Sequence, residues 1–212
     1  MAFLAPKGLL TPVGDKRKAT GAVRVRVAAL AALTLVVAVT YATGPGVASA
    51  RALPIERVKA AFIYKFANFV EWPPSAFESK DSPLVIGAVA DDHFVDILKD
   101  VVDGKSVNAR SIEVKKIGAL SDLKGCQIAF ISDTKHDELD RILSDIQDET
   151  ILSIGDSDDF VDKGGIIKLY EEKNRLRFEI NLDSAKRAQL KISSKLLDLA
   201  TAVKGNASLE SE

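Results

Sequence analysis

The first regular pattern of apolar residues beyond residue 50 has the spacing of a helix. Across residues 55–71, one face of a helix would carry Ile55, Val58, Phe62, Phe66 and Phe69. Pro54 suits a first helical turn, and the prolines after Trp72 would end the helix. The pattern predicts a helix over 55–71. Its apolar face is wide enough to pack on the core and also to meet a second subunit.

Short continuous apolar runs come next, and they have the length of strands. The runs at 84–89 and 126–131 are apolar at nearly every position, which is typical of strands buried on both faces of a parallel sheet, and another strand is predicted over 150–154. A further strand is predicted over 111–117. Helical patterns separate the runs: one opens at Asp91 and reaches Val101, and one places Leu139, Ile142, Leu143 and Ile146 on a single face.

The pattern changes towards the end of the chain. Residues 166–170 and 176–182 read as two strands joined by a polar turn, which predicts an antiparallel hairpin. Asp183 would cap a last helix through Val203, and the tail over 205–212 is expected to be flexible. We therefore predict a single α/β domain over 51–204. Its mainly parallel sheet would have helices on both faces, an antiparallel hairpin and a C-terminal helix.

Composition agrees with a folded domain and excludes several classes of protein. The 212 residues are 47% hydrophobic and 28% charged, with 29 basic and 30 acidic side chains and one cysteine. A disordered chain and a disulfide-rich scaffold are excluded. The acidic excess lies beyond residue 50, so nucleic acid is not an expected partner. Cys126 lies inside an apolar run, where a buried small side chain is the simplest interpretation.

The first fifty residues have the pattern of an export signal. A basic stretch ends at Arg26, an apolar run covers 27–39, and small residues follow at 48–50. The run is shorter than the roughly 20 residues that cross a bilayer. This order predicts a cleaved Sec-type signal peptide over 1–50, with cleavage between Ala50 and Arg51 and a periplasmic mature protein. An uncleaved anchor is the alternative.

Familiar catalytic patterns do not occur in the sequence. It lacks a dinucleotide fingerprint, a complete phosphate-binding loop, metal-ligand spacing of His or Cys, and a nucleophile elbow. We predict no catalytic residues, no cofactor and no metal. Acidic residues follow three predicted strands, which leaves a small-ligand crevice as an alternative, formed near Asp91, Ser132, Asp133 and Gly155.

Several motifs together resemble the YfiR-like family. The stretch 59–73 is similar to the opening signature of the family, and the order and spacing of later segments are similar too. The most specific piece is Arg-Leu-Arg-Phe-Glu-Ile-Asn-Leu-Asp at 175–183, followed by Ile-Ser-Ser-Lys-Leu-Leu at 192–197. The resemblance covers nearly all of 55–203.

The resemblance implies a non-catalytic regulator in the periplasm. Such a protein would bind the periplasmic part of a membrane diguanylate cyclase or related sensor and repress it, which affects cyclic-di-GMP and biofilm. An outer-membrane lipoprotein would relieve the repression, and a homodimer would be expected. Better-known relatives contain several cysteines, whereas this chain has Cys126 alone, so an internal disulfide is not available. A small-ligand binding protein of the periplasm is the alternative function.

Two groups of residues are candidate contacts with a partner. Aromatic side chains near the diproline and the acidic loop form the first group, with core packing as the alternative: Phe69, Trp72, Phe77 and Phe160. Charged side chains that alternate on one face of a hairpin strand form the second group, with a solvated sheet face as the alternative: Arg175, Arg177 and Glu179.

Overall fold

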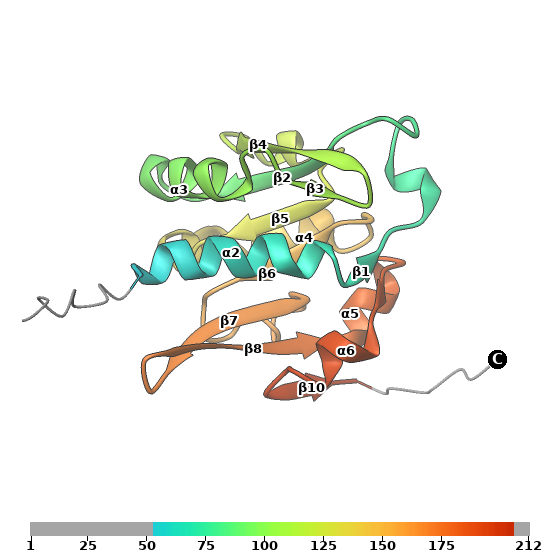
Figure 1. Ribbon diagram of the computed structural model, residues 1–212. Coiled ribbons are helices and arrows are strands. Elements are labelled where there is room, and N and C mark those ends of the chain that lie inside the picture. Colours follow the sequence, from blue (N-terminus) through green and yellow to red (C-terminus); the bar gives the residue numbers. More distant parts are fainter. Residues whose placement is uncertain (1–52, 206–212) are drawn as a thin grey trace, which may run out of the picture. The chain divides into compact units, whose positions relative to one another are not determined.

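An eight-stranded sheet organises the protein. The computed structural model describes residues 53–205 (Figure 1). The strands lie in the order β10-β8-β7-β6-β5-β2-β4-β3. In chain order they are β2 (Leu84–Val89), β3 (Ser106–Val107), β4 (Arg110–Lys116), β5 (Ile128–Ile131), β6 (Leu152–Gly155), β7 (Ile167–Glu172), β8 (Arg175–Asn181) and β10 (Ala202–Lys204).

Strand direction makes most of this sheet parallel. Strands β4, β2, β5, β6 and β7 run parallel to one another, and β8 turns back antiparallel to β7. The turn between β7 and β8 consists of Lys173 and Asn174, both with positive φ, as a tight two-residue hairpin turn requires. The predicted sheet and hairpin are both confirmed.

Helices cover both faces of the sheet. On one face lie α2 (Ile55–Ala67) and α3 (Asp92–Val102), which pack on Leu84, Ile86 and Ala88 of β2. On the other face lies α4 (Leu139–Ile146), whose apolar residues join Val85 and Val89 in a second cluster. Alternate side chains of one strand therefore enter different cores, which explains why the sequence shows an unbroken apolar run there.

Short elements complete the edges of the domain. Three 3-10 turns are η1 (Pro74–Ala76), η2 (Leu120–Leu123) and η3 (Asp133–Glu138). A small separate sheet pairs β1 (Val70–Glu71) with β9 (Lys191–Ile192). Helix α2 consequently stops at Ala67 rather than continuing to residue 71, because Val70 and Glu71 pair with Ile192 and Lys191 of β9.

The C-terminal helix differs most from its prediction. Instead of one helix over 183–203, the chain forms α5 (Leu182–Arg187), β9, α6 (Ser194–Leu197) and β10. Gln189 has a φ of 57°, a left-handed conformation that ends α5, and the next buried residue is Leu190. Of the residues predicted to share one helix face, Ala185 is buried on α5, Ala188 just after it and Leu196 on α6, while Leu199 is 66% exposed.

Phe160 is central to the second core. Its ring is fully buried and lies against the backbones of two glycines, one in β6 and one just before β7. A Cβ atom on Gly155 would come within 2.2 Å of the ring, and a Cβ on Gly165 would come equally close. Phe160 therefore fixes the loop from β6 to β7, and it has no exposed surface to offer a partner.

Candidate functional site

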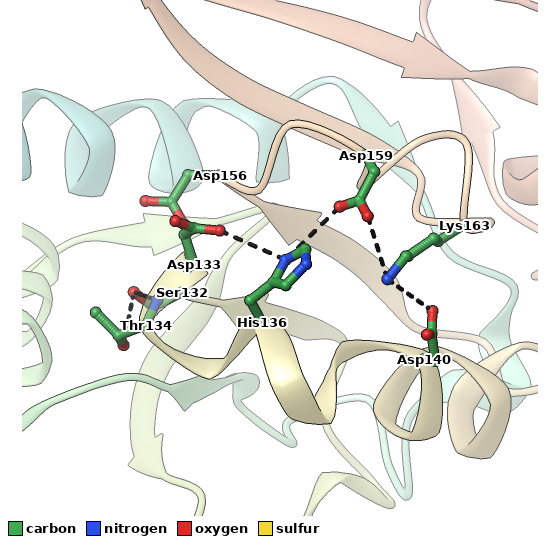
Figure 2. Close-up of polar contacts among 8 residues, drawn as sticks. All are labelled: Ser132, Asp133, Thr134, His136, Asp140, Asp156, Asp159 and Lys163. Atoms are coloured by element: carbon green, nitrogen blue, oxygen red, sulfur yellow. Dashed lines mark hydrogen bonds and ion pairs between the residues drawn. The ribbon is translucent and has the colours of Figure 1, made fainter.

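Polar side chains gather where β5 and β6 end (Figure 2). Asp156 directly follows β6, and its Oδ1 accepts a hydrogen bond of 2.6 Å from the backbone N–H of Asp133, which follows β5. Its Oδ2 lies 2.5 Å from the Nζ of Lys59 on α2. Both oxygens of this carboxylate, which is 11% exposed, are thus occupied by groups of the chain itself.

A histidine bridges two acidic residues of the same region. The Nδ1 of His136 lies 3.7 Å from Asp133 Oδ1 and 3.8 Å from Asp159 Oδ1 (Figure 2). Lys163 continues the row, with Nζ 3.1 Å from carboxylate oxygens of both Asp159 and Asp140. This arrangement connects η3, the loop after β6, and α4 by alternating charges when the histidine is protonated.

The charges in this row affect one another. Burial acts to raise the pKa of Asp159, but the hydrogen bond and charge of Lys163, a local backbone hydrogen bond and the charge of His136 outweigh it, so the pKa lies below its ordinary value. Hydrogen bonds to Asp140 and Asp159 raise the pKa of Lys163. Each group therefore stabilises the charged form of the other.

The same region does not have the features of a metal centre. Within residues 53–205, no three His, Cys, Asp or Glu side chains are grouped so as to hold a metal ion. Lys59 and Lys163 supply the positive charge that a cation would otherwise provide. The structure thus gives the acidic residues after β5 and β6 a role in fixing loops to helices.

A second polar surface lies on the β7–β8 hairpin. Side chains of β8 alternate: Arg175 and Arg177 are exposed and Glu179 is half-buried, whereas Phe178 and Ile180 between and beyond them enter the core under α2. The sheet register adds neighbours from β7 that the sequence did not single out. We call the resulting surface the hairpin face: Lys168, Tyr170, Glu172, Arg175, Arg177 and Glu179.

Opposite charges alternate across the hairpin face. Lys168 Nζ lies 3.2 Å from Glu179 Oε2, and Arg177 Nε lies 3.8 Å from Glu172 Oε2. Lys168 also lies over the ring of Tyr170, with 5.2 Å between Nζ and the ring centre. Its Nζ donates to the carbonyl of Asp158, so the hairpin face continues into the loop that carries Asp159.

Trp72 and Phe77 occupy the opposite end of the sheet, in a segment anchored by Gln127. Trp72 Nε1 donates a hydrogen bond of 3.1 Å to the Gln127 carbonyl. The buried side chain of Gln127 donates to the carbonyls of Ala76 and Gly125 and accepts from the backbone N–H of Val85. This one amide therefore fixes the segment after the diproline to the sheet.

Arg110 covers the remaining aromatic residue of this segment. Its guanidinium lies 3.8 Å from the centre of the Phe77 ring, and Nη1 donates to the carbonyls of Ser79 and Ser82. Phe69, also half-buried, packs against the first core. Trp72, Phe77 and Phe69 thus keep part of their surface available while they hold local structure together.

The sequence-derived candidates consequently fall in separate places. Arg175, Arg177 and Glu179 share one surface, and Trp72 and Phe77 lie at the other end of the sheet. Phe160 is in the core. The predicted cleavage position at Ala50 and Arg51 lies outside the described residues. Within 53–205, no helix has the length and apolar character needed to cross a membrane.

Comparison with protein families gives a match over most of the chain. The model of the YfiR/HmsC-like family matches residues 56–201, which include every strand of the large sheet except β10, both cores and the hairpin face. The chain belongs to the YfiR/HmsC-like family. The resemblance inferred from the motifs at 59–73 and 175–197 is thereby confirmed. No curated protein matches the chain.

Two solved structures are similar to the chain at low sequence identity. A conserved domain protein from Vibrio cholerae O1 biovar El Tor is 12% identical, with a TM-score of 0.45 over 57% of this chain and 55% of that one. The ABC domain in complex with L-Trp from Streptococcus pneumonia is 11% identical, with a TM-score of 0.50 over 68% of this chain and 60% of that one. This YfiR/HmsC-like chain thus covers a little over half the length of each.

Proposed function

We propose that the protein is an exported regulator that binds the periplasmic part of a membrane signalling protein and represses a diguanylate cyclase. The observation that carries this proposal is the match of residues 56–201 to the YfiR/HmsC-like family, which suggests periplasmic control of diguanylate cyclase signalling. Export by the signal peptide over 1–50 and cleavage after Ala50 belong to the same proposal. So do a homodimer and release of the regulator by an outer-membrane lipoprotein.

Regulation of this kind requires a surface rather than a catalytic centre. A protein that binds one state of its target more tightly than another shifts the balance between those states without chemistry of its own. The carboxylate of Asp156, after β6, supports a non-catalytic protein, because Lys59 and the backbone amide of Asp133 already occupy both of its oxygens. We therefore propose that the protein acts by binding alone.

The hairpin face is the surface that we propose for the membrane partner. Its Arg177–Glu172 pair is long and close to half exposed, so separating the pair costs little free energy. Both side chains are then free to pair with charges of a partner, which favours specific and salt-sensitive association. Trp72 and Phe77 are a secondary candidate contact at the other end of the sheet.

Affinity capture tests the proposal. The full chain with a C-terminal tag would be exported in its native host, and proteins that co-purify from detergent-solubilised envelope would be identified by mass spectrometry. We expect a membrane protein with a cytoplasmic diguanylate cyclase domain. Capture of the same protein should fall by about tenfold with Arg177→Glu, because charge reversal opposes pairing with the partner.

A matched control separates binding from folding. Arg141→Glu reverses an exposed charge on α4, away from the hairpin face, and should leave capture unchanged. Trp72→Phe tests the secondary surface in the same assay. An eluate free of membrane proteins after cross-linking would overturn the proposed function. Capture that is insensitive to Arg177→Glu would instead remove the hairpin face and leave the function standing.

A further inference from the structure

One carboxylate oxygen of Asp159 is buried without a hydrogen-bond donor. The side chain as a whole is 38% exposed, but its Oδ1 atom is buried, and no donor within residues 53–205 reaches that atom. The other oxygen, Oδ2, lies 3.1 Å from the Nζ of Lys163. A buried acceptor that lacks a donor costs free energy, so Oδ1 marks a place where a donor is missing.

His136 can supply the missing donor when its ring is protonated. Its Nδ1 atom lies 3.8 Å from Asp159 Oδ1 and 3.7 Å from Asp133 Oδ1, so two carboxylates face the same ring nitrogen (Figure 2). Both distances are longer than a hydrogen bond. A neutral imidazole has a proton on Nδ1 in only one of its two tautomers, whereas the imidazolium ion always has one there. Protonation therefore provides both a donor and a positive charge for these oxygens.

Negative charge is in excess around the histidine ring. The group of η3 that faces His136 is Asp133, and the group that faces it from the loop after β6 is Asp159. Lys163, at the end of this loop, places one positive charge beside Asp159. Asp140 of α4 lies at the same distance of 3.1 Å from that ammonium group and offsets its charge. Three carboxylates thus surround one ammonium group and the ring.

The remaining charged residues of η3 and of the loop over 156–163 do not cancel this excess. They are either ion-paired or acidic: Asp156 pairs with Lys59, Lys135 with Glu138 and Asp162 with Lys204, while Asp137 and Asp158 are acidic. A positive charge on His136 is therefore attracted by the carboxylates that it faces.

The loop that carries Asp159 also supports the hairpin face. Lys168 of β7 donates a hydrogen bond of 3.2 Å to the carbonyl of Asp158, the residue directly before Asp159. The same ammonium group lies 3.2 Å from Glu179 Oε2 and over the ring of Tyr170. The position of one acceptor of Lys168 consequently depends on how firmly the loop is held to η3.

We propose that protonation of His136 fixes the loop after β6 to η3, through Asp159 and Asp133, and thereby holds the hairpin face in one arrangement. Histidine changes its charge between about pH 5 and pH 8, so the contact forms as the medium becomes acidic and is lost as the pH rises. The contact itself requires no partner. Its regulatory meaning, which is control of partner binding by acidity, rests on the proposed function.

Hydrogen exchange on the purified protein tests the contact in the absence of a partner. The reporting amides are those of Lys163, which donates to the Asp159 carbonyl within the loop, and of Asp133, which donates to Asp156. After correction for the intrinsic effect of pH on exchange, both should be protected about threefold more at pH 5.5 than at pH 7.5, as expected of a half-exposed ion pair. The amide of Lys105, in the turn after α3, should not change.

The two histidines of the chain provide a matched pair of variants. His136→Gln should abolish the threefold change, and so should Asp159→Asn, because it removes the charge that faces Nδ1. His93→Gln alters an exposed residue of α3 and should keep the change. Protection that does not depend on pH, or a pH response that persists in His136→Gln, would overturn the proposal.

NMR spectra test whether the contact reaches the hairpin face. The amide signals of Asp158 and Lys168 should shift between pH 7.5 and pH 5.5 in the wild-type protein and in His93→Gln, but not in His136→Gln. Loop protection without a shift at Lys168 would overturn the effect on the hairpin face. Because these experiments contain no partner, their failure would leave the proposed function standing, and loss of envelope capture would leave the contact standing.

Discussion

The ammonium group of Lys59 lies 2.5 Å from the carboxylate of Asp156, and this contact joins residues 97 positions apart. It fastens α2 to the loop that follows β6, and the same carboxylate accepts the amide of Asp133. Three elements of the fold thus meet at one side chain. The contact is shielded from solvent, since the two side chains are 22% and 11% exposed.

Shielding should make this ion pair measurable by a double-mutant cycle. Lys59→Met, Asp156→Asn and the double variant would be unfolded in urea, and we expect a coupling free energy of about 1–2 kcal/mol. The control is the exposed pair Lys204–Asp162, with side chains 53% and 72% exposed, whose coupling should be below about 0.5 kcal/mol. Equal coupling in the two pairs would contradict the role given to Lys59.

Close packing of Phe160 predicts a second effect on stability. Gly155→Ala should lower the free energy of unfolding by about 3 kcal/mol, because the added methyl group overlaps the ring. In a Phe160→Ala background the same substitution should cost less than about 1.5 kcal/mol, since the ring is gone. Gly118→Ala, where no atom lies within 4 Å of the added carbon, is the control and should change stability by less than about 0.5 kcal/mol. Additive costs would show that the two residues do not compete for space.

Acid should remove the contribution of Asp159. The pKa of Asp159 is lower in the folded protein than in the unfolded chain. Its contribution to the free energy of unfolding is therefore present above the unfolded-state pKa and is lost as the pH falls through the folded-state pKa. Asp159→Asn should therefore flatten the fall in stability between about pH 4 and pH 2, measured by urea unfolding across that range. Asp148→Asn, an exposed carboxylate on the surface, serves as the control. If the stability of Asp159→Asn fell between pH 4 and pH 2 as steeply as that of the unchanged protein, this would argue against the contact between Asp159 and Lys163.

Lys163 should act at the other end of the pH scale. The pKa of Lys163 is higher in the folded protein than in the unfolded chain. Its contribution to the free energy of unfolding is therefore complete below the unfolded-state pKa and is lost as the pH rises through the folded-state pKa. Lys163→Met should consequently remove part of the stability difference between pH 9 and pH 11, values chosen around its ordinary pKa of about 10.4. The same urea experiments measure it. Asp159→Asn should show part of this alkaline effect as well, because the carboxylate is one of the two partners.

The single thiol should react slowly in the native protein. Cys126 is 4% exposed, and burial raises its pKa, so both access and thiolate content are low. At pH 8 we expect iodoacetamide to label the native protein about a hundredfold more slowly than the urea-unfolded protein. Leu123→Ala, which opens the core beside Cys126, should raise the native rate. Equal native and unfolded rates would mean that this part of the core opens readily.

Sequence patterns predicted the buried strands well and the chain ends poorly. Strands β2, β5 and β6 were visible because both of their faces are apolar, and the residues predicted to face inward on α4 are all buried. Strands β1, β9 and β10 are two or three residues long and depend on partners far away in the chain. Such pairing leaves no local pattern, so the C-terminal segment was taken for a helix.

The candidate surfaces were only partly visible for a similar reason. Alternation along β8 placed Arg175, Arg177 and Glu179 on one face, and that face was found as expected. Lys168, Tyr170 and Glu172 alternate in the same way on β7, but their proximity depends on the register of the hairpin. The sequence did not indicate a role for Lys59, because only the folded sheet brings its partner Asp156 close to it.

The placement of α2 has a consequence for how the chain is made. Its apolar residues pack with Phe178 of β8, with α3 and with the sheet, all of which follow it in the chain. Synthesis proceeds from the N-terminus, so this helix emerges long before its cover exists, and closing such distant contacts is slow. The nascent chain therefore exposes the aromatic face of α2 during most of its synthesis. A chaperone can bind this face until the β7–β8 hairpin has emerged and covers it.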